Sequence, residues 1–557
     1  MKDEMKPCHH TLSDDVTYKE VVVIGNGPSG MVTSFMLAGN IPYLKEIPET
    51  LPIDDMLKAR LQNLPPGQNL LEVDLMELAE GLEGRSQNPI SLLVDNLLRP
   101  CADLGLQEDS LIEWRYDADK QIDHIVLGKG PPGGAWHTFP GGVRTLSPGS
   151  WLSLPPHSGV GARDRVPARA VAAYCRRYVH ACKLQRFFRS GFMVSRVTRV
   201  PRSEATPCQQ SCSRNANFWV SGFDKKESRE VTFACAHVVL ACGAGDKPNV
   251  LPAHLSAHCT HSAVALERAV HQLAAREGGD DSPEKSVLVV GSGVSAADAV
   301  RLARLAALPV KHVHRQPADS LAKLSPLTYP DYCHVYKMML DGPSGNHPYY
   351  TPYPEHMITE IISITPKETS PKLHQDIYDE TLGLKKVKLL NLMNNETVEL
   401  TVAFVVVLIG SKPDLFFLQT NYDNEKCIKC IQKQNQKQCF LRNHWHYIKS
   451  VLGQSIQSCK SKFNYEINGN DTKCILPDCN KCECYCANPY SNGIGYGIDE
   501  NKPVDGRSNP IAIDKSTHEV LNGPKGMYAM GPLTADNFIR FIPGGAMAIV
   551  ADLHKKK

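Results

Sequence analysis

The alternation of apolar and polar residues predicts two copies of one local arrangement: a buried strand, a glycine-rich turn and a helix. Residues 19–24 carry a β-branched run that leads into glycines and then an apolar-periodic segment ending near Ala38. Residues 287–305 repeat this order with an Ala- and Leu-rich helix that Pro309 ends, and a further strand is expected at 310–315. Strands that alternate with helices in this way are typical of α/β folds with parallel sheets.

The rest of the chain carries further periodic segments and one segment without periodicity. The predicted elements are helices over 70–98 on either side of Pro89 and over 168–188, buried strands over 231–240 and 401–410, and a strand, loop and helix over 526–553. After Leu418 the composition changes. Residues 421–480 are rich in Lys, Asn, Gln and Cys and poor in periodic apolar residues, which indicates an insertion or a loosely ordered loop.

Composition then limits the classes of protein to consider. With 557 residues the chain exceeds one ordinary core, so two or three domains are expected. The 61 Lys and Arg residues nearly balance 59 Asp and Glu residues, which leaves no electrostatic footprint for nucleic acid. The longest apolar stretch, about 402–410, is far short of the roughly 20 residues that span a bilayer. Residues 1–20 lack the apolar core of a signal peptide, so we expect a cytoplasmic protein with reduced thiols.

The first glycine turn has the spacing of a dinucleotide-binding loop, GxGxxG, formed by Gly25, Gly27 and Gly30. The first glycine permits the tight turn after the strand, the second lets the backbone approach a pyrophosphate, and the third lets the helix pack on the strand. Pro28 and Ser29 open the helix, whose free N–H groups would receive the phosphates. The alternative is a glycine turn with a structural role only.

The second turn carries Gly291 and Gly293, followed by Ser295 and by Ala296 at the third position, where alanine is an accepted substitute. Two dinucleotide sites in one chain suggest two nucleotides that meet, such as a flavin and a nicotinamide. The strand after this unit ends at Arg315 without a carboxylate. An arginine there suits the 2′-phosphate of NADPH, because its fork bonds phosphate oxygens in pairs. The alternative is a solvated surface arginine.

These motifs together resemble FAD- and NADPH-dependent monooxygenases. Residues 133–137, with Gly134, Trp136 and His137, resemble the GGxW segment of flavin-containing and Baeyer–Villiger monooxygenases, which lies along the flavin. Residues 238–243, ending in Gly243, and 404–418 resemble the two ATG-type strand-turns of two-dinucleotide flavoproteins. Residues 258–262 resemble the His-Ser end of the flavin-monooxygenase fingerprint, with His261.

The match is closer to one family, the oxidative stress-induced growth inhibitors. It rests on the segments 24–30, 80–87, 132–137 and 529–540. The last segment contains Gly531, Asp536, Asn537 and Arg540. The resemblance implies FAD and NADPH as cofactors, and a link to growth restraint, cell death and cytokinesis, with protein partners and a cytoskeletal or midbody association.

The sequence also departs from the flavoprotein pattern. The second ATG-type turn, residues 409–411, lacks its threonine, and the flavin-capping Gly-Asp is replaced by the segment 531–537. No short strand ending in Glu or Asp follows the first helix at the usual distance. Glu46 and Glu49 are therefore weak candidates for the FAD ribose.

The fold class expected is α/β, with two Rossmann-like domains, an FAD domain and an NADPH domain inserted in it, and a Cys-rich irregular insertion. The expected boundaries are a polar tail at 1–16, the FAD domain at 17–252, 411–420 and 491–557, the NADPH domain at 253–410, and the insertion at 421–490.

The hypothesis for function is hydride transfer from NADPH to FAD, reaction of the reduced flavin with O₂ to a C4a-peroxide, and oxygenation of an unidentified substrate. His137, His261 and Arg540 are the candidate catalytic residues; Arg540 is alternatively a helix-capping or surface arginine, and Trp136 a core residue. Two rival classes stay open. A flavin disulfide reductase is disfavoured because no C-x-x-C lies between Gly30 and Asp246, whereas a non-catalytic flavoprotein regulator is compatible with the altered flavin motifs.

Nine of the 19 cysteines fall between Cys427 and Cys486. Two C-x-x-C pairs, Cys427 with Cys430 and Cys479 with Cys482, have the ligand types of a tetrahedral zinc site. The separation of the pairs is longer than a compact zinc ribbon uses. A reduced, disordered insertion is therefore favoured over zinc, and oxidation-prone exposed thiols are a third alternative.

Overall fold

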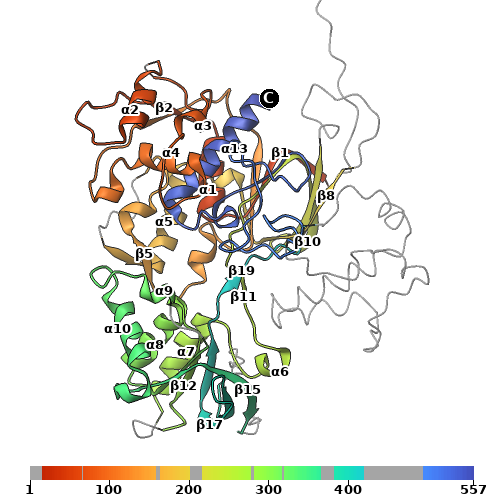
Figure 1. Ribbon diagram of the computed structural model, residues 1–557. Coiled ribbons are helices and arrows are strands. Elements are labelled where there is room, and N and C mark those ends of the chain that lie inside the picture. Colours follow the sequence, from red (N-terminus) through yellow and green to blue (C-terminus); the bar gives the residue numbers. More distant parts are fainter. Residues whose placement is uncertain are drawn as a thin grey trace, which may run out of the picture.

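The computed structural model describes residues 16–65, 67–157, 164–200, 216–276, 282–315, 319–364, 382–418 and 493–556. These residues form two α/β units, one above the other in Figure 1. The upper unit contains both the first described strand and the last helix of the chain, whereas the lower unit is built from the middle of the sequence.

The sheet of the first unit has seven strands. Its order is β7 (Phe188–Ser190), β4 (His124–Gly128), β1 (Val16–Ile24), β10 (Arg229–Leu240), β9 (Phe218–Asp224) and β8 (Phe192–Arg199), with β20 (Met527–Ala529) pairing with β10. Strand β1 is parallel to β4 on one side and to β10 on the other. Because β20 comes from the C-terminal part of the chain, the two ends of the sequence complete one sheet.

The helices of the first unit pack on one face of this sheet. Helix α1 (Pro28–Leu37) is buried at every residue after Pro28, because it lies between the sheet and α13 (Ile542–Lys556). A helix that is apolar all round is expected in such a place. A Cβ on Gly544, in the first turn of α13, would overlap the backbone of Ser91 in α4 (Pro89–Leu98). Pro89 is the first residue of α4 rather than a break within a helix, as suits a proline without an N–H.

The segment between α1 and β4 is an addition outside the main sheet. It holds β2 (Asn40–Leu44), α2 (Asp55–Gln62), α3 (Leu75–Leu78), α4, η1 (Ala102–Leu104) and β3 (Ile112–Tyr116). Strand β2 pairs antiparallel with β3, and neither is a neighbour of β1. The strand that follows α1 in sequence is therefore not the strand that lies beside β1 in space.

The second unit contains a four-stranded parallel sheet in the order β14 (Tyr350–Pro354), β13 (Val310–His314), β12 (Val287–Val290) and β18 (Phe404–Val407). One face packs against α7 (Ala263–Ala274), α8 (Val294–Leu305) and α10 (Pro330–Asp341). The other face packs against the antiparallel strands β15 (His356–Ser363), β16 (Lys385–Asn391) and β17 (Thr397–Val402). Residues of β12 alternate between the two cores, since successive side chains of a strand point to opposite faces.

Two short antiparallel strands, β11 (Lys247–Pro248) and β19 (Ser411–Lys412), lie where the chain passes between the units (Figure 1). The remaining elements are η2 (Gly134–His137), β5 (Arg144–Pro148), η3 (Gly149–Leu152), β6 (Arg165–Pro167), α5 (Ala168–Ala181), η4 (Gln185–Phe187), α6 (Ala253–Ser256), α9 (Asp319–Ala322), η6 (Gly342–Gly345), η10 (Gly531–Thr534) and η11 (Ile539–Phe541). The expected α/β class with two Rossmann-like units is confirmed. Within the described residues, no helix is long and apolar enough to cross a membrane.

Candidate functional site

The three glycines of the first loop have different surroundings. Gly25 has φ +116°, and a Cβ there would overlap the carbonyl of Ala241 in the loop after β10. A Cβ on Gly30 would overlap the carbonyl oxygen of Gly25, so this glycine lets the helix pack on the turn. A Cβ on Gly27 would meet nothing within 4 Å. The first and third glycines are therefore required by packing, whereas the second borders open space.

The open space lies at the start of helix α1. Gly27 is the N-cap residue and supplies no side-chain hydrogen bond, Pro28 follows it, and the first turn contains no acidic residue. The N–H groups of a first helical turn have no partner within the helix, and the helix dipole favours negative charge there. This helix start can therefore receive a phosphate.

Three other segments converge on the first loop. A Cβ on Gly134, in η2, would lie 3.2 Å from the Cα atom of Gly27. A Cβ on Gly531 would overlap the hydroxyl oxygen of Ser29, so η10 touches the same helix start. Gly243 has φ +77° and nothing within 4 Å of the position of a Cβ. The GGxW segment, the loop after β10 and the C-terminal segment thus meet around one helix start.

The second loop repeats the geometry of the first. Gly291 has φ +137°, and a Cβ there would overlap the carbonyl of Leu408, just after β18. Gly293 borders open space and is the N-cap residue of α8, without a side-chain hydrogen bond and without an acidic residue in the first turn. Ala296 is buried against this turn, and Ser295 is exposed. Both loops are thus built to leave an uncapped helix start accessible.

A buried histidine that the sequence reasoning missed supports the second loop. His312 lies fully buried in β13, with its Nε2 atom 2.7 Å from the carbonyl oxygen of Gly291 and its Nδ1 atom 2.9 Å from the hydroxyl of Tyr350. Burial, together with the nearby His314, lowers the pKa of His312 to about 3, so the ring is neutral. Nε2–H then donates to Gly291, and Nδ1 accepts from Tyr350. Its only signal in the sequence is a polar residue within an apolar strand.

Arg315 directly follows β13 and is exposed. No other described residue forms a hydrogen bond or ion pair with its guanidinium group. This position, beyond the carboxyl end of the strand next to β12, is where a Rossmann-type domain contacts the ribose of its ligand.

Of the three expected catalytic residues, His137 and His261 lie on different units. The Nε2 atom of His137 is 2.8 Å from the carbonyl oxygen of Pro132, which holds the ring against its own loop. His261 precedes Ser262, the N-cap residue of α7, and its buried Nε2 atom has no partner among the described residues. Burial lowers the pKa of His261 and favours its neutral form. No contact between described residues joins the two histidines.

Trp136 is half-buried at the margin of the first core. Its ring meets the ring of Phe139 edge-on, with centroids 5.5 Å apart. Trp136 therefore contacts the first core and belongs to η2, the segment whose Gly134 approaches Gly27.

Arg540, the third candidate catalytic residue, lies buried among carboxylates of the first unit. The side chain is 3% exposed, its Nε atom donates to Asp95 at 2.8 Å, and one terminal nitrogen donates to Asp103 at 2.8 Å. The guanidinium also lies 4.3 Å from the centroid of the Trp151 ring. Its hydrogen bonds therefore join η11 to α4 and η1.

Asp536, in the segment that replaces the flavin-capping Gly-Asp, is held by hydrogen bonds within the fold. Its buried carboxylate accepts hydrogen bonds from Ser86, from Asn88 at 2.8 Å and from Ser91 at 2.7 Å. Burial raises the pKa of this carboxyl group, although the three donors oppose the shift. Residues at the end of the segment 80–87 and just after it therefore hold the C-terminal segment by hydrogen bonds. The next residue, Asn537, donates through Nδ2 to Gly506 at 3.2 Å.

The two candidates for the FAD ribose, Glu46 and Glu49, do not lie at the end of a strand next to β1. Glu46 and Glu49 are exposed and follow β2, which is not part of the main sheet. Of the two parallel neighbours of β1, the one on the side away from β10 is β4, which ends at Gly128 and is followed by Lys129. In the sequence, the strand that lies beside β1 is the one directly before the GGxW segment. It is not the strand directly after the first helix.

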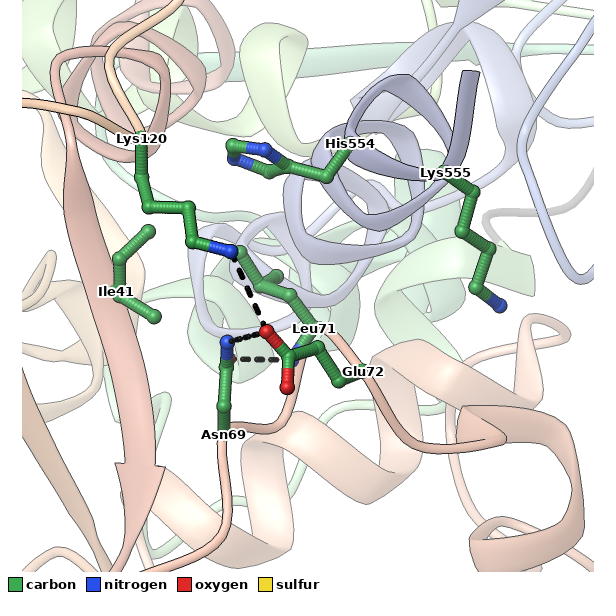
Figure 2. A pocket seen from close by; sticks show the side chains of 7 residues that line it. All are labelled: Ile41, Asn69, Leu71, Glu72, Lys120, His554 and Lys555. Atoms are coloured by element: carbon green, nitrogen blue, oxygen red, sulfur yellow. Dashed lines mark hydrogen bonds and ion pairs between the residues drawn. The ribbon is translucent and has the colours of Figure 1, made fainter. Parts of the chain in front are cut away.

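The described residues contain a cavity of about 230 Å³ (Figure 2). It is lined by Ile41, Asn69, Leu71, Glu72, Lys120, His554 and Lys555. Lys120 and Glu72 form an ion pair at 3.4 Å across it. The cavity is lined by the last turn of α13 and by Ile41, which follows the C-terminal end of α1, and the ten residues of α1 span about 15 Å. It is therefore not part of the glycine-loop site.

The expected zinc ligands Cys427, Cys430, Cys479 and Cys482 lie outside the described residues. Among the residues that the structure does describe, no group of three His, Cys, Asp or Glu side chains could hold a metal ion.

The chain is similar to several known proteins. Residues 202–401 match the family described as L-lysine 6-monooxygenase/L-ornithine 5-monooxygenase. The chain is 33% identical to oxidative stress-induced growth inhibitor 1 of Mus musculus, over 96% of this chain and 95% of that protein. It is 31% identical to the Homo sapiens protein of the same name, with the same coverage. Among solved structures, bacillithiol disulfide reductase Bdr from Bacillus cereus matches with a TM-score of 0.48 and 12% identity, covering 97% of this chain and 100% of that chain.

Two glycine loops, each at the start of a helix beside a parallel sheet, give the chain a fold of the flavin-dependent monooxygenase-like class. Within that class, the chain belongs to the oxidative stress-induced growth inhibitor family, because the similarity extends over nearly the whole of both chains. The resemblance expected from the sequence motifs is thereby confirmed.

Proposed function

We propose that this protein is an FAD- and NADPH-dependent monooxygenase that acts on a substrate not yet identified. The observation that carries the proposal is the pair of glycine loops in which Gly27 and Gly293 each border open space at an uncapped helix start. When bound, the two cofactors supply hydride transfer and the activation of O₂. The chain's part is to bind and orient them and to exclude water.

In this proposal the first unit, residues 17–252, 411–420 and 491–557, binds FAD. Its pyrophosphate would lie on the start of α1, among residues 25–30, with Gly134, Trp136, Gly243 and Gly531 around it. These residues belong to the segments that converge on Gly27, which supports the assignment. Asp536 and Asn537 would support FAD binding indirectly, because their hydrogen bonds hold the C-terminal segment in place.

The second unit, residues 253–410, would bind NADPH. Its pyrophosphate would lie on the start of α8, at Gly291, Gly293, Ser295 and Ala296. The exposed guanidinium group of Arg315 is available to the 2′-phosphate, because it has no partner among the described residues. A charge-assisted hydrogen bond of this kind favours NADPH over NADH by roughly 10- to 100-fold.

His137 and His261 are the residues that we propose to hold or move a proton. The hydrogen bond from Nε2–H of His137 to Pro132 leaves its Nδ1 atom as an acceptor. Burial lowers the pKa of His261 and so favours the neutral ring, which is the form that can act as a base. Arg540 is not included, because Asp95 and Asp103 occupy its guanidinium group.

The test is direct: purified full-length protein, reconstituted with FAD, should show a flavin absorption spectrum and consume NADPH and O₂. In Gly27→Asp the new carboxylate would cap α1 and repel phosphate, so flavin binding should be lost while the fold keeps its stability to about 0.3 kcal/mol. Gly293→Asp should retain flavin and lose NADPH oxidation. A wild-type protein that takes up no flavin would contradict the proposal.

A non-catalytic flavoprotein regulator that acts through protein partners is the second candidate function. It is favoured by the absence of a carboxylate at the end of β4 and by the structural roles of Asp536 and Arg540. NADPH oxidation that does not exceed the rate with free flavin would support this candidate over the enzyme. In either case, we propose a role in growth restraint shared with the relatives named above.

A further inference from the structure

The first dinucleotide site has an unusual feature at the place where a ribose is normally held. In Rossmann-type domains an acidic residue at the end of the strand next to β1 binds the ribose hydroxyl. The register pairs Ile24 of β1 with Leu127 of β4, so the strand end beside Gly25 is Gly128. A glycine has no side chain with which to bind a ribose.

The second unit provides an internal standard for this position. Its register pairs Val290 of β12 with Val313 of β13, so the residues beyond the pair are His314 and Arg315. By the same count, Gly128 corresponds to His314, and Lys129 corresponds to Arg315. Neither unit has a carboxylate at the strand end, but only the first has lost the side chain altogether.

The space at Gly128 is filled by the residue between the first two glycines of the loop. Asn26 is 4% exposed, and its side-chain amide would be overlapped by a Cβ on Gly128. The Nδ2 atom of Asn26 donates to the carbonyl oxygen of Gly130 at 2.7 Å. Position 128 is therefore a glycine because the amide of Asn26 lies where another side chain would begin. The corresponding loop residue in the second unit is Ser292.

The carboxylates near the end of β4 give a reason why a neutral side chain, rather than a further carboxylate, would bind the ribose there. Lys129 lies between two carboxylates, with its Nζ atom 3.0 Å from Asp246 and 3.4 Å from Asp414. A glutamate at position 128 would add a third carboxylate beside these two. An amide provides an acceptor oxygen without adding to this negative charge.

We propose that Asn26 takes the place of the missing carboxylate in the first site. Because Gly130 holds its Nδ2 atom, the Oδ1 atom is the acceptor for an adenosine ribose hydroxyl. A neutral acceptor is weaker than a carboxylate, so flavin should bind about 10-fold less tightly than in a site with an acidic residue there. This inference rests on the proposed function, since it assumes that FAD occupies the first loop.

The experiment compares two ligands on the full-length apoprotein: FAD and its analogue with 2′-deoxyadenosine. Dissociation constants are measured from the flavin fluorescence. The wild type should prefer FAD by about 5- to 10-fold. Asn26→Ala should bind both ligands equally. Asn26→Ser is the second variant, because a serine already occupies the corresponding position of the second loop, and it should also lose most of the preference.

Ser292→Ala is the matched control and should leave the wild-type preference unchanged. If the Asn26 variants bind flavin and still prefer FAD by the wild-type factor, or if the wild type shows no preference, the role of Asn26 is wrong while the flavin site stands. If no protein in the series binds either ligand, the proposed function fails and this inference fails with it.

Discussion

At the scale of single residues, the glycines and Arg540 show how position decides the role of a side chain. Gly25 and Gly27 are two residues apart, yet one is fixed by the carbonyl of Ala241 and the other borders open space. Arg540 lies in a segment typical of its family, yet its guanidinium group forms ion pairs with Asp95 and Asp103 of the same unit. A motif therefore identifies a segment more securely than it identifies the task of each residue in it.

The structural role of Arg540 leads to a prediction. In Arg540→Met the buried carboxylate of Asp95 would lose its main partner, and removal of one partner of a buried pair costs about 3–5 kcal/mol. The double variant Arg540→Met with Asp95→Asn should recover only part of this loss, because it removes the buried carboxylate but also takes away the ion-pair partner of Arg99. Urea unfolding measures both. A single variant of normal stability that cannot oxidise NADPH would instead return Arg540 to the active site.

At the scale of elements, a group of contacts between described residues joins the two units away from the β11 and β19 strands. Arg165 in β6 of the first unit forms an ion pair with Asp331 in α10 of the second at 2.8 Å. Its guanidinium lies over the rings of Tyr329 and Tyr332, at 4.9 and 4.8 Å from their centroids. The hydroxyl of Tyr329 donates to Leu146 at 2.6 Å. This group of contacts fixes α10 against the hairpin formed by β5 and β6.

Arg165→Ala should therefore loosen the contact between the units. The change removes one of the two arginine partners of Asp331, the other being Arg301 at 2.7 Å, and should cost about 1–3 kcal/mol. Hydrogen exchange should rise in both α10 and the β5–β6 hairpin. Arg169→Ala, an exposed residue in the next element, is the control and should change neither region. Faster exchange in α10 alone would mean that Arg165 does not couple the units.

At the scale of the whole molecule, buried histidines predict how stability depends on pH. Burial lowers the pKa of His124, His237 and His518 to about 4 and that of His312 to about 3. The unfolded chain takes up these protons near pH 6.5, whereas the folded protein does so only at much lower pH. The stability due to the neutral rings is therefore complete above pH 6.5 and is lost as the pH falls toward 4.

The free energy of unfolding should fall by up to about 1.4 kcal/mol per pH unit for each buried histidine between pH 6 and 5. His124→Gln removes one such group and should reduce the slope by about 1 kcal/mol per pH unit. His254→Gln, at an exposed histidine, is the control. Urea unfolding at several pH values measures the slopes. Equal slopes in the wild type and in His124→Gln would contradict the prediction.

Features that depend on a few neighbouring residues could be predicted from the sequence. Both glycine loops, the α/β class and the strand ending at Arg315 follow from local spacing, because a tight turn requires glycine and a buried strand requires an apolar run. The family was likewise recognisable from short segments. These features involve interactions within about ten residues of chain.

Only the tertiary structure decided which distant residues meet. The position of Gly128 beside β1 depends on a segment that leaves the sheet after α1 and returns at β4. The partners of Asp536 and Arg540 lie more than 400 residues earlier in the chain. Topology sets such contacts, since the closing of a long loop leaves no local pattern in the sequence. The sequence therefore determined where the two glycine loops lie, and the packing of the chain decided which side chains near them are already occupied by partners.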